Sequence, residues 1–238
     1  QGNGLDNQRG TLLGGQLDIE TRGQRLDNRA GTLGTQKGAL SVHSGVLDNQ
    51  GGRVQSAADL TINTAGQDID NRFTAGSGGL LAAGKLQLEG GVLDNRGGAV
   101  NAQGDARLLL ARVDNSAGGT LASAADLSLR AASLVNAGGR VQAGRNLDLT
   151  LDGHVDNAAG AGGLGSAGGG GHLWRHCARS RAAGRACLGP SRGDAGAREA
   201  GLGDPRGPTG AGTGTALAAK GGAGCRVVDA ADCLTLGG

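Results

Sequence analysis

The 238-residue chain has no Met, no Tyr, one Phe, one Trp and only three Pro. The cores of conventional enzymes draw on large aromatic and Met side chains, so this composition argues against a catalytic globular domain. No continuous apolar run is long enough to span a bilayer, and we expect no transmembrane segment. The N-terminal segment lacks the apolar stretch of a signal peptide, and we expect that peptide to be missing from a fragment. A formal net charge of +2 argues against a nucleic-acid partner.

The abundant residue is Gly, with 51 copies, and the composition changes near residue 160. All four Cys, all three Pro and the only Trp lie after that point. The sequence therefore predicts a division into residues 1–160 and residues 161–238.

Residues 1–160 contain an internal repeat whose marker is an aliphatic residue, usually Asp, and then Asn. The intervals between successive marker Asn residues are 21, 21, 22, 24, 20, 21 and 21. The eight marker residues are Asn7, Asn28, Asn49, Asn71, Asn95, Asn115, Asn136 and Asn157.

Each repeat carries three short segments in which aliphatic residues alternate with polar ones, as in Leu60 and Ile62 or Leu108 and Leu110. Three short strands in about 20 residues make one coil of a β-solenoid. A lone coil buries too few side chains to offset its ordering, whereas coils stacked about 4.8 Å apart share one core. The repeat therefore predicts an all-β parallel β-helix of about eight coils of 20–24 residues, too narrow inside for aromatic rings.

The marker Asn has a structural interpretation. Asn tolerates the left-handed backbone conformation that a sharp corner needs, and its amide can bond the same amide one coil away in a ladder. We expect the preceding Asp to point outward and solvate the corner. The longest interval contains Phe73 to Ser77, which we interpret as a small surface loop. That loop is either a tolerated insertion or a contact point using Phe73.

Units such as LDNQGGRVQSAADLTIN and LVNAGGRVQAGRNLDLT resemble the haemagglutinin repeats of filamentous haemagglutinin-like exoproteins. The resemblance implies a right-handed β-helix that is secreted to the bacterial cell surface through an outer-membrane two-partner-secretion transporter. It implies an adhesive rod that meets an unidentified receptor on a host or neighbouring cell. The same repeats form the shaft of contact-dependent growth-inhibition toxins, so presentation of a distal toxic module is the alternative.

Residues 161–238 lose the aliphatic period and are rich in Gly, Ala and Arg. Such a segment buries too little apolar surface to order itself, which predicts a disordered tail. A frameshift in a GC-rich gene is the other interpretation. The joint appearance of the rare residues Trp174, Cys177 and Cys187 favours the frameshift.

We predict no catalytic residue, cofactor or metal. The tail's His and Cys residues lack the paired spacing of a zinc site, and His43 and His154 are isolated residues that we expect at the surface. The marker Asp residues recur once per coil as turn elements rather than gathering in one catalytic cluster. A candidate receptor motif is the tripeptide Arg192, Gly193 and Asp194, which integrins recognise.

Overall fold

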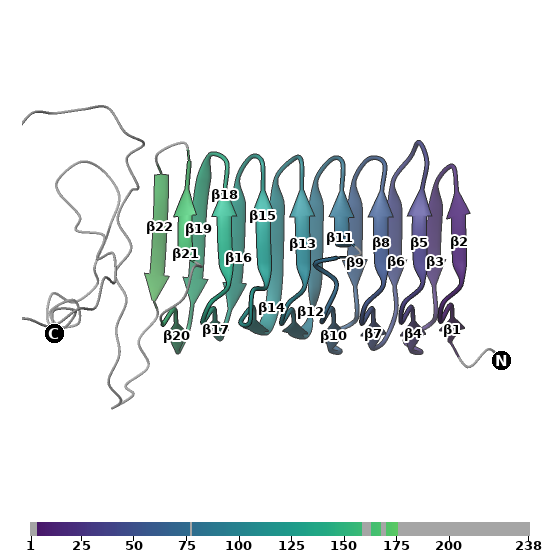
Figure 1. Cartoon of the computed structure of the whole chain (residues 1–238), viewed down its shortest axis with the longest axis horizontal. Helices are drawn as coiled ribbons and strands as arrows, with labels where there is room; N and C mark the ends of the chain where they lie inside the picture. Colours follow the sequence, from purple (N-terminus) through teal and green to yellow (C-terminus); the bar gives the residue numbers. More distant parts are fainter. Residues whose placement is uncertain (1–3, 77, 159–162, 168–169, 176–238) are drawn as a thin grey trace, which may run out of the picture.

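A computed structural model describes residues 4–76, 78–158 and 163–167, and the backbone of residues 170–175. These residues form 22 strands and no helix (Figure 1). In particular, none of the described residues forms a helix long and apolar enough to cross a membrane.

The strands lie on three faces, which we name the marker face and, by their first members, the β2 face and the β3 face. The marker face comprises β1 (Leu5–Asp6), β4 (Leu26–Asp27), β7 (Leu47–Asp48), β10 (Ile69–Asp70), the ends of β12 (Leu86–Asp94) and β14 (Ala106–Asp114), β17 (Ser133–Val135) and β20 (Val155–Asp156). The β2 face comprises β2 (Thr11–Gly14), β5 (Thr32–Thr35), β8 (Arg53–Ser56), β11 (Gly79–Ala82), β13 (Ala99–Ala102), β15 (Thr120–Ser123), β18 (Arg140–Ala143) and β21 (Gly163–Ser166). The β3 face comprises β3 (Leu17–Glu20), β6 (Leu40–His43), β9 (Leu60–Asn63), the starts of β12 and β14, β16 (Leu127–Ala131), β19 (Asn146–Leu151) and β22 (Gly170–Arg175).

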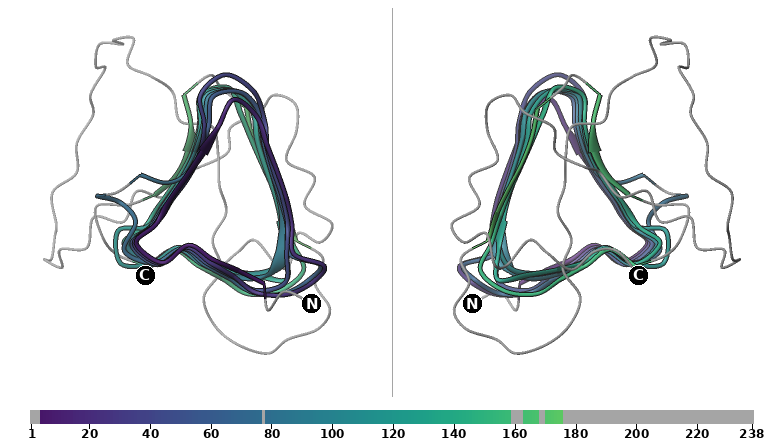
Figure 2. Two further views of the ribbon diagram at one scale, coloured as in Figure 1. Left: turned by 90° about the vertical axis from the view of Figure 1, so that its right-hand side faces the viewer. Right: turned by 90° about the vertical axis from the view of Figure 1, so that its left-hand side faces the viewer.

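Each strand pairs in parallel with the strand one repeat later, as Leu5 with Leu26 and Leu26 with Leu47. The coils enclose a triangular cross-section (Figure 2). Seen in Figure 1, the chain rises along the β2 face in front and descends along the β3 face behind while it advances from the N-terminus. That sense is right-handed, as parallel crossovers almost always are. The predicted all-β, right-handed parallel β-helix is confirmed, with eight strands on each face.

The core consists of continuous rows of aliphatic side chains. On the β3 face the inward positions Leu60, Leu86 and Ala106 follow one another in register, each at most 3% exposed. Burial of one Leu or Val stabilises the fold by roughly 1.5–3 kcal/mol, and each coil adds several to the rows of its neighbours. The one Phe stands outside this interior and is 67% exposed.

The expected division at residue 160 stays a prediction. Strands β21 and β22 lie beyond that residue and pair with β18 and β19. Residues 176–238, which hold most of the proposed tail, lie outside the described residues.

Candidate functional site

All eight marker Asn residues lie at one corner of the triangle, between the marker face and the β2 face. Their side chains form a ladder of seven hydrogen bonds, in which each Nδ2 donates to the Oδ1 of the Asn one coil later. The donor–acceptor distances are 2.7–2.8 Å from Asn7 through to Asn157. The ladder runs through all eight copies of the marker.

The second N–H of most ladder amides is also used. Asn71 Nδ2 donates to the carbonyl of Ala99 at 2.9 Å, and Asn95 Nδ2 donates to that of Thr120 at 3.1 Å. The central Asn side chains are fully buried, so these amides have exchanged water for protein partners. A buried amide left without partners is costly, which makes each rung sensitive to loss of its neighbour.

The corner conformation differs from the sequence prediction. The marker Asn residues do not have a positive φ; from Asn7 to Asn136, the left-handed residue is the one two positions later. This residue is Ala30 (φ 52°) after Asn28 and Gly97 (φ 58°) after Asn95. The Asn side chain instead forms a rung of the ladder, and the residue two positions later makes the sharp turn.

A Gly three positions after most marker Asn residues closes the corner. A Cβ at Gly52 would lie 2.3 Å from the carbonyl oxygen of Asn28 and 2.6 Å from Oδ1 of Asn49. Gly98 and Gly139 are confined in the same way. The recurrent Gly is therefore required by the close approach of two coils at the ladder.

An Asp precedes seven of the eight marker Asn residues and also has a specific role. All seven carboxylates accept a hydrogen bond from the backbone N–H two residues later, at 2.9–3.3 Å. Such an Asx turn shapes the chain entering the corner. We expected this Asp to point outward into solvent. Asp27 is instead only 7% exposed, so its carboxylate is largely buried.

Arginines pair with these carboxylates within and between coils. Arg96 lies 2.6 Å from Asp94 and 3.8 Å from Asp114 in the next coil. Arg29 lies 2.7 Å from Asp27, and hydrogen bonding from this guanidinium lowers the pKa of Asp27 despite burial. Burial raises the pKa of Asp94, but hydrogen bonds from Arg96 outweigh it and the net pKa is lowered. Without such cations, a column of Asp residues one coil apart would repel.

The loop containing Phe73 projects from the same corner (Figure 2). Phe73 has a φ of 57°, and the Arg72 guanidinium lies 5.9 Å from its ring centroid. A positive φ is rare for a bulky residue. Thr74 is fully buried below it, where its hydroxyl accepts the Ala99 N–H at 3.0 Å. The loop is thus anchored in the stack, while the ring remains exposed.

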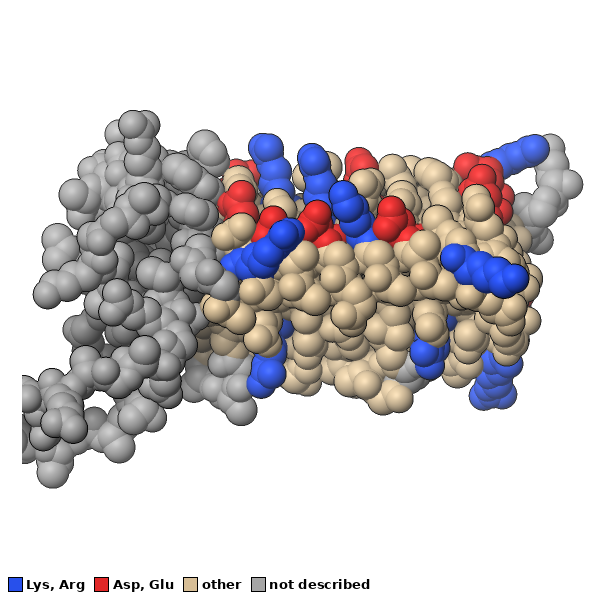
Figure 3. All heavy atoms as spheres, turned by 90° about the horizontal axis from the view of Figure 1, so that it is seen from above, with Lys and Arg blue, Asp and Glu red and all other residues tan. Residues whose placement is uncertain are grey.

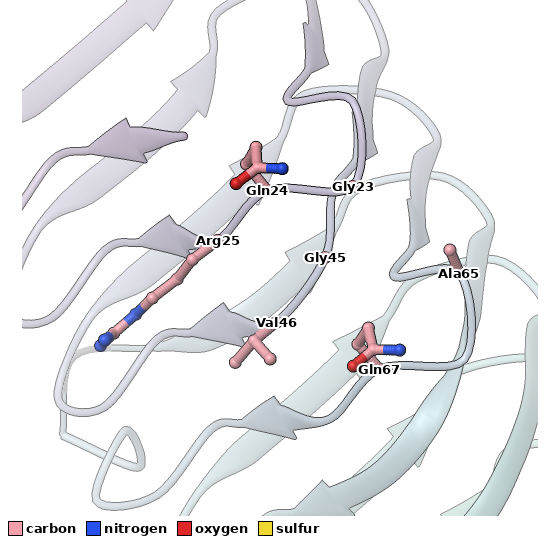
Figure 4. Close-up of a pocket in the computed structure, with 7 residues that line it drawn as sticks. All are labelled: Gly23, Gln24, Arg25, Gly45, Val46, Ala65 and Gln67. Atoms are coloured by element: carbon pink, nitrogen blue, oxygen red, sulfur yellow. The ribbon is translucent and has the colours of Figure 1, made fainter. Parts of the chain in front are cut away.

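A second corner, between the β3 and marker faces, carries a notch (Figure 4). The connection from β6 to β7 is three residues, whereas those from β3 to β4 and β9 to β10 are five. Val46 therefore lies recessed between Gln24 and Gln67. Arg25, at its edge, is bound to Asp48 at 2.7 Å. Two amides, one paired guanidinium and an apolar floor do not form a catalytic arrangement.

A further group of charged side chains lies at the corner between the β2 and β3 faces, where Arg145 is paired with Asp105 at 2.9 Å and with Asp126 at 3.2 Å. The part of the chain that the structure describes contains no group of three His, Cys, Asp or Glu residues able to hold a metal ion. His43 is exposed, as expected, and His154 lies in a different coil. The Arg192, Gly193 and Asp194 motif lies outside the described residues, as do all four Cys.

Sequence reasoning located the Asn column but missed the Asx turns and the Arg pairing. A signal for the pairing was present, because Arg stands two positions after Asp in the copies at Asp27, Asp70 and Asp94. The ion pairs between coils could not be predicted in this way, because they depend on the register of one coil against the next, which only the stack provides.

The matches to known proteins cover the same repeats. The profile of the haemagglutinin repeat family matches residues 1–30, 12–73, 71–111 and 109–159, together about two-thirds of the chain. A curated relative, deoxyribonuclease CdiA of Dickeya dadantii (strain 3937), is 34% identical over 153 residues. That alignment covers 64% of this chain, and the chain spans about 4% of the relative's length. The solved structures provide no match.

Proposed function

Since the chain belongs to the haemagglutinin-repeat family, we propose that its filamentous shaft is part of a secreted adhesin, held at the bacterial surface, that attaches to cells or surfaces. The observation that carries the proposal is the unbroken stack of eight coils around one aliphatic core. Such a stack extends by about 4.8 Å with each coil and holds its two ends apart. In this proposal the stack spans a distance from the cell and presents an outward surface.

The partners in this proposal follow from the family. An outer-membrane transporter of the two-partner-secretion type would export the chain, and a receptor on a host or neighbouring cell would bind it. Recognition would then depend on outward side chains, because the inward ones are buried in the core and in the Asn ladder.

Attachment is tested with the full chain coupled to fluorescent beads. We expect the beads to bind epithelial or bacterial cells saturably, and free chain in excess to displace them. The matched control is a bead carrying the same mass of albumin. Attachment no better than this control would refute the adhesive role.

The tripeptide at residues 192–194 stays a prediction that the same assay tests. Asp194→Glu keeps the charge but alters the side-chain length on which integrin recognition depends. If the motif carries host-cell attachment, this variant and a soluble RGD peptide both reduce bead binding. Unchanged binding in both would remove the motif from the proposal.

The second candidate is the shaft of a contact-dependent growth-inhibition toxin that presents a distal toxic module. The relative named deoxyribonuclease CdiA favours it, since the likeness extends over the repeats. The two candidates differ in what the intact gene encodes after the shaft. We would sequence the DNA across codons 150–238 and beyond, and translate all three frames.

A nuclease-like module followed by a small immunity gene would select the toxin shaft. Repeats that resume in another frame would mark residues 161–238 as a frameshift, with the tripeptide discarded. Continued repeats without a toxic module would select the adhesin. Growth of neighbouring cells in co-culture, with and without the immunity gene, supplies the functional readout.

A further inference from the structure

The β3 face presents two rows of outward side chains whose order follows from the strand register. The first row runs from Asp18 through Ser41, Thr61 and Gln87 to Arg107. The second row, two residues further along each strand, begins at Glu20 and reaches Glu89, Leu109 and Arg130. The register therefore sets the order in which charged side chains follow one another along the stack.

The two signs of charge are separated on this face. Asp18, Glu20 and Glu89 occupy coils toward the N-terminus, and Arg107 and Arg130 occupy the following coils. All five side chains are exposed. Asp148, further on in β19, is half-buried.

Several arginines at other places on the stack are already held in ion pairs. Arg29, Arg72 and Arg96 are paired with Asp residues of the marker face, and Arg145 on the ridge between the β2 and β3 faces is paired with Asp105. Neither Arg107 nor Arg130 forms an ion pair or side-chain hydrogen bond with any described residue. Figure 3 shows acidic and basic side chains together along the ridge and the β3 side, whereas the β2 side carries only scattered Lys and Arg.

We propose that the β3 face binds a second copy of this chain in antiparallel orientation. A two-fold axis along the strands, midway between β9 and β12, places β3 of one copy over β16 of the other and β6 over β14. Rotation about that axis keeps each row on its own counterpart. Glu20 then faces Arg130 of the second copy, and Asp18 lies within one coil of its Arg107.

The remaining contacts of this arrangement are compatible. Glu89 faces Asn63 of the second copy, and Leu109, which is 40% exposed, faces His43. No like charges face each other directly, the nearest like pair being the two Glu89 side chains one coil apart across the axis, and Asp148 lies outside the paired stretch. A parallel arrangement would instead set the acidic coil of Asp18 and Glu20 against its own copy, which like-charge repulsion opposes.

The interface is small, since a face two side chains wide buries less than the roughly 1,200–2,000 Å² of stable complexes. Association should therefore be weak, and because it rests on exposed charges it should be sensitive to salt. We expect the association constant to fall at least about tenfold between low and high salt.

The test uses sedimentation of the full chain and two charge-reversal variants. Arg107→Glu/Arg130→Glu makes the face acidic throughout, and Asp18→Arg/Glu20→Arg leaves its paired ends basic. Each variant alone should remain monomeric where the unchanged chain associates, while an equimolar mixture should associate again. The matched control, Lys37→Glu/Arg140→Glu, changes the same charge at exposed positions off this face and should associate normally. Circular dichroism verifies that every variant is folded.

Three outcomes would overturn the proposal. The unchanged chain could stay monomeric at high concentration in low salt. The single variants could associate as well as the control, which would place the contact on other faces or at the ends of the stack. The mixture could fail to associate although each variant is folded, which would exclude pairing by charge.

Discussion

Replacement of one rung tests whether the Asn ladder stabilises the stack. Asn95 is fully buried in the middle of the ladder. Its amide donates to Asn115 at 2.7 Å and to the carbonyl of Thr120 at 3.1 Å, and its Oδ1 accepts from Asn71 at 2.7 Å. Asn95→Ala removes all three hydrogen bonds.

The expected loss in the free energy of unfolding follows from the polar groups that Asn95→Ala leaves unpaired. Asn115 Oδ1 loses its donor, and Asn71 Nδ2 keeps only its hydrogen bond to Ala99. A buried polar group left unpaired costs about 1–3 kcal/mol. Asn115 Oδ1 and one N–H of Asn71 are thus left unpaired, and the carbonyl of Thr120 loses one donor. Asn95→Ala should therefore lower the free energy of unfolding by about 3–5 kcal/mol.

The matched control is Asn101→Ala in the same coil. Asn101 points outward from β13 and is partly exposed. A surface change of this kind should alter the free energy of unfolding by no more than about 0.5 kcal/mol. Urea unfolding followed by far-UV circular dichroism measures both variants. Hydrogen exchange should localise the lost protection to β12 and β13, since stacked repeats respond to their nearest neighbours. Equal stability of the two variants would refute a stabilising ladder.

Four further outcomes are expected. Leu108 is only 2% exposed. Leu108→Asp therefore buries an unpaired charge and should abolish cooperative melting near its coil; an unchanged melting curve would contradict the inward placement of Leu108. A Cβ at Gly52 would meet backbone 2.3 Å away. Gly52→Ala should for that reason destabilise the fold by at least about 1–3 kcal/mol, measured by urea unfolding. Asp27 has a lowered pKa in the fold. Its pairing with Arg29 should stabilise the fold above about pH 4 and be lost progressively as the pH falls through the folded pKa, so Arg29→Gln should weaken the acid dependence of the melting temperature. Far-UV circular dichroism should show β structure with little helix, and a helical spectrum would be incompatible with the stack.

The corner shows how far sequence reasoning reached. The spacing of the marker identified Asn as the recurring corner residue, and the ladder follows from stacking identical side chains in register. The backbone conformation was misassigned, because tolerance for a left-handed φ describes what Asn can adopt and not what this corner needs. In the fold Ala30 takes that conformation while Asn28 keeps its side chain inside.

The surface features were beyond sequence reasoning for a different reason. The notch at Val46 arises because the β6–β7 connection is two residues shorter than those beside it. The charge rows of the β3 face depend on which residues fall opposite one another after repeats of unequal length. A period identifies the repeating unit, but a shift of one residue turns an outward side chain inward.

For this chain, the sequence by itself determined the period, the three alternating segments of each coil and the column of corner Asn residues. It could do so because a solenoid coil touches mainly its neighbours, so a local pattern is also the three-dimensional one. The tertiary structure alone decided the left-handed positions, the Asp–Arg pairs between coils and the separated charges of the β3 face. These depend on register across coils, which is set only when backbone hydrogen bonds, core packing and turn lengths are satisfied together.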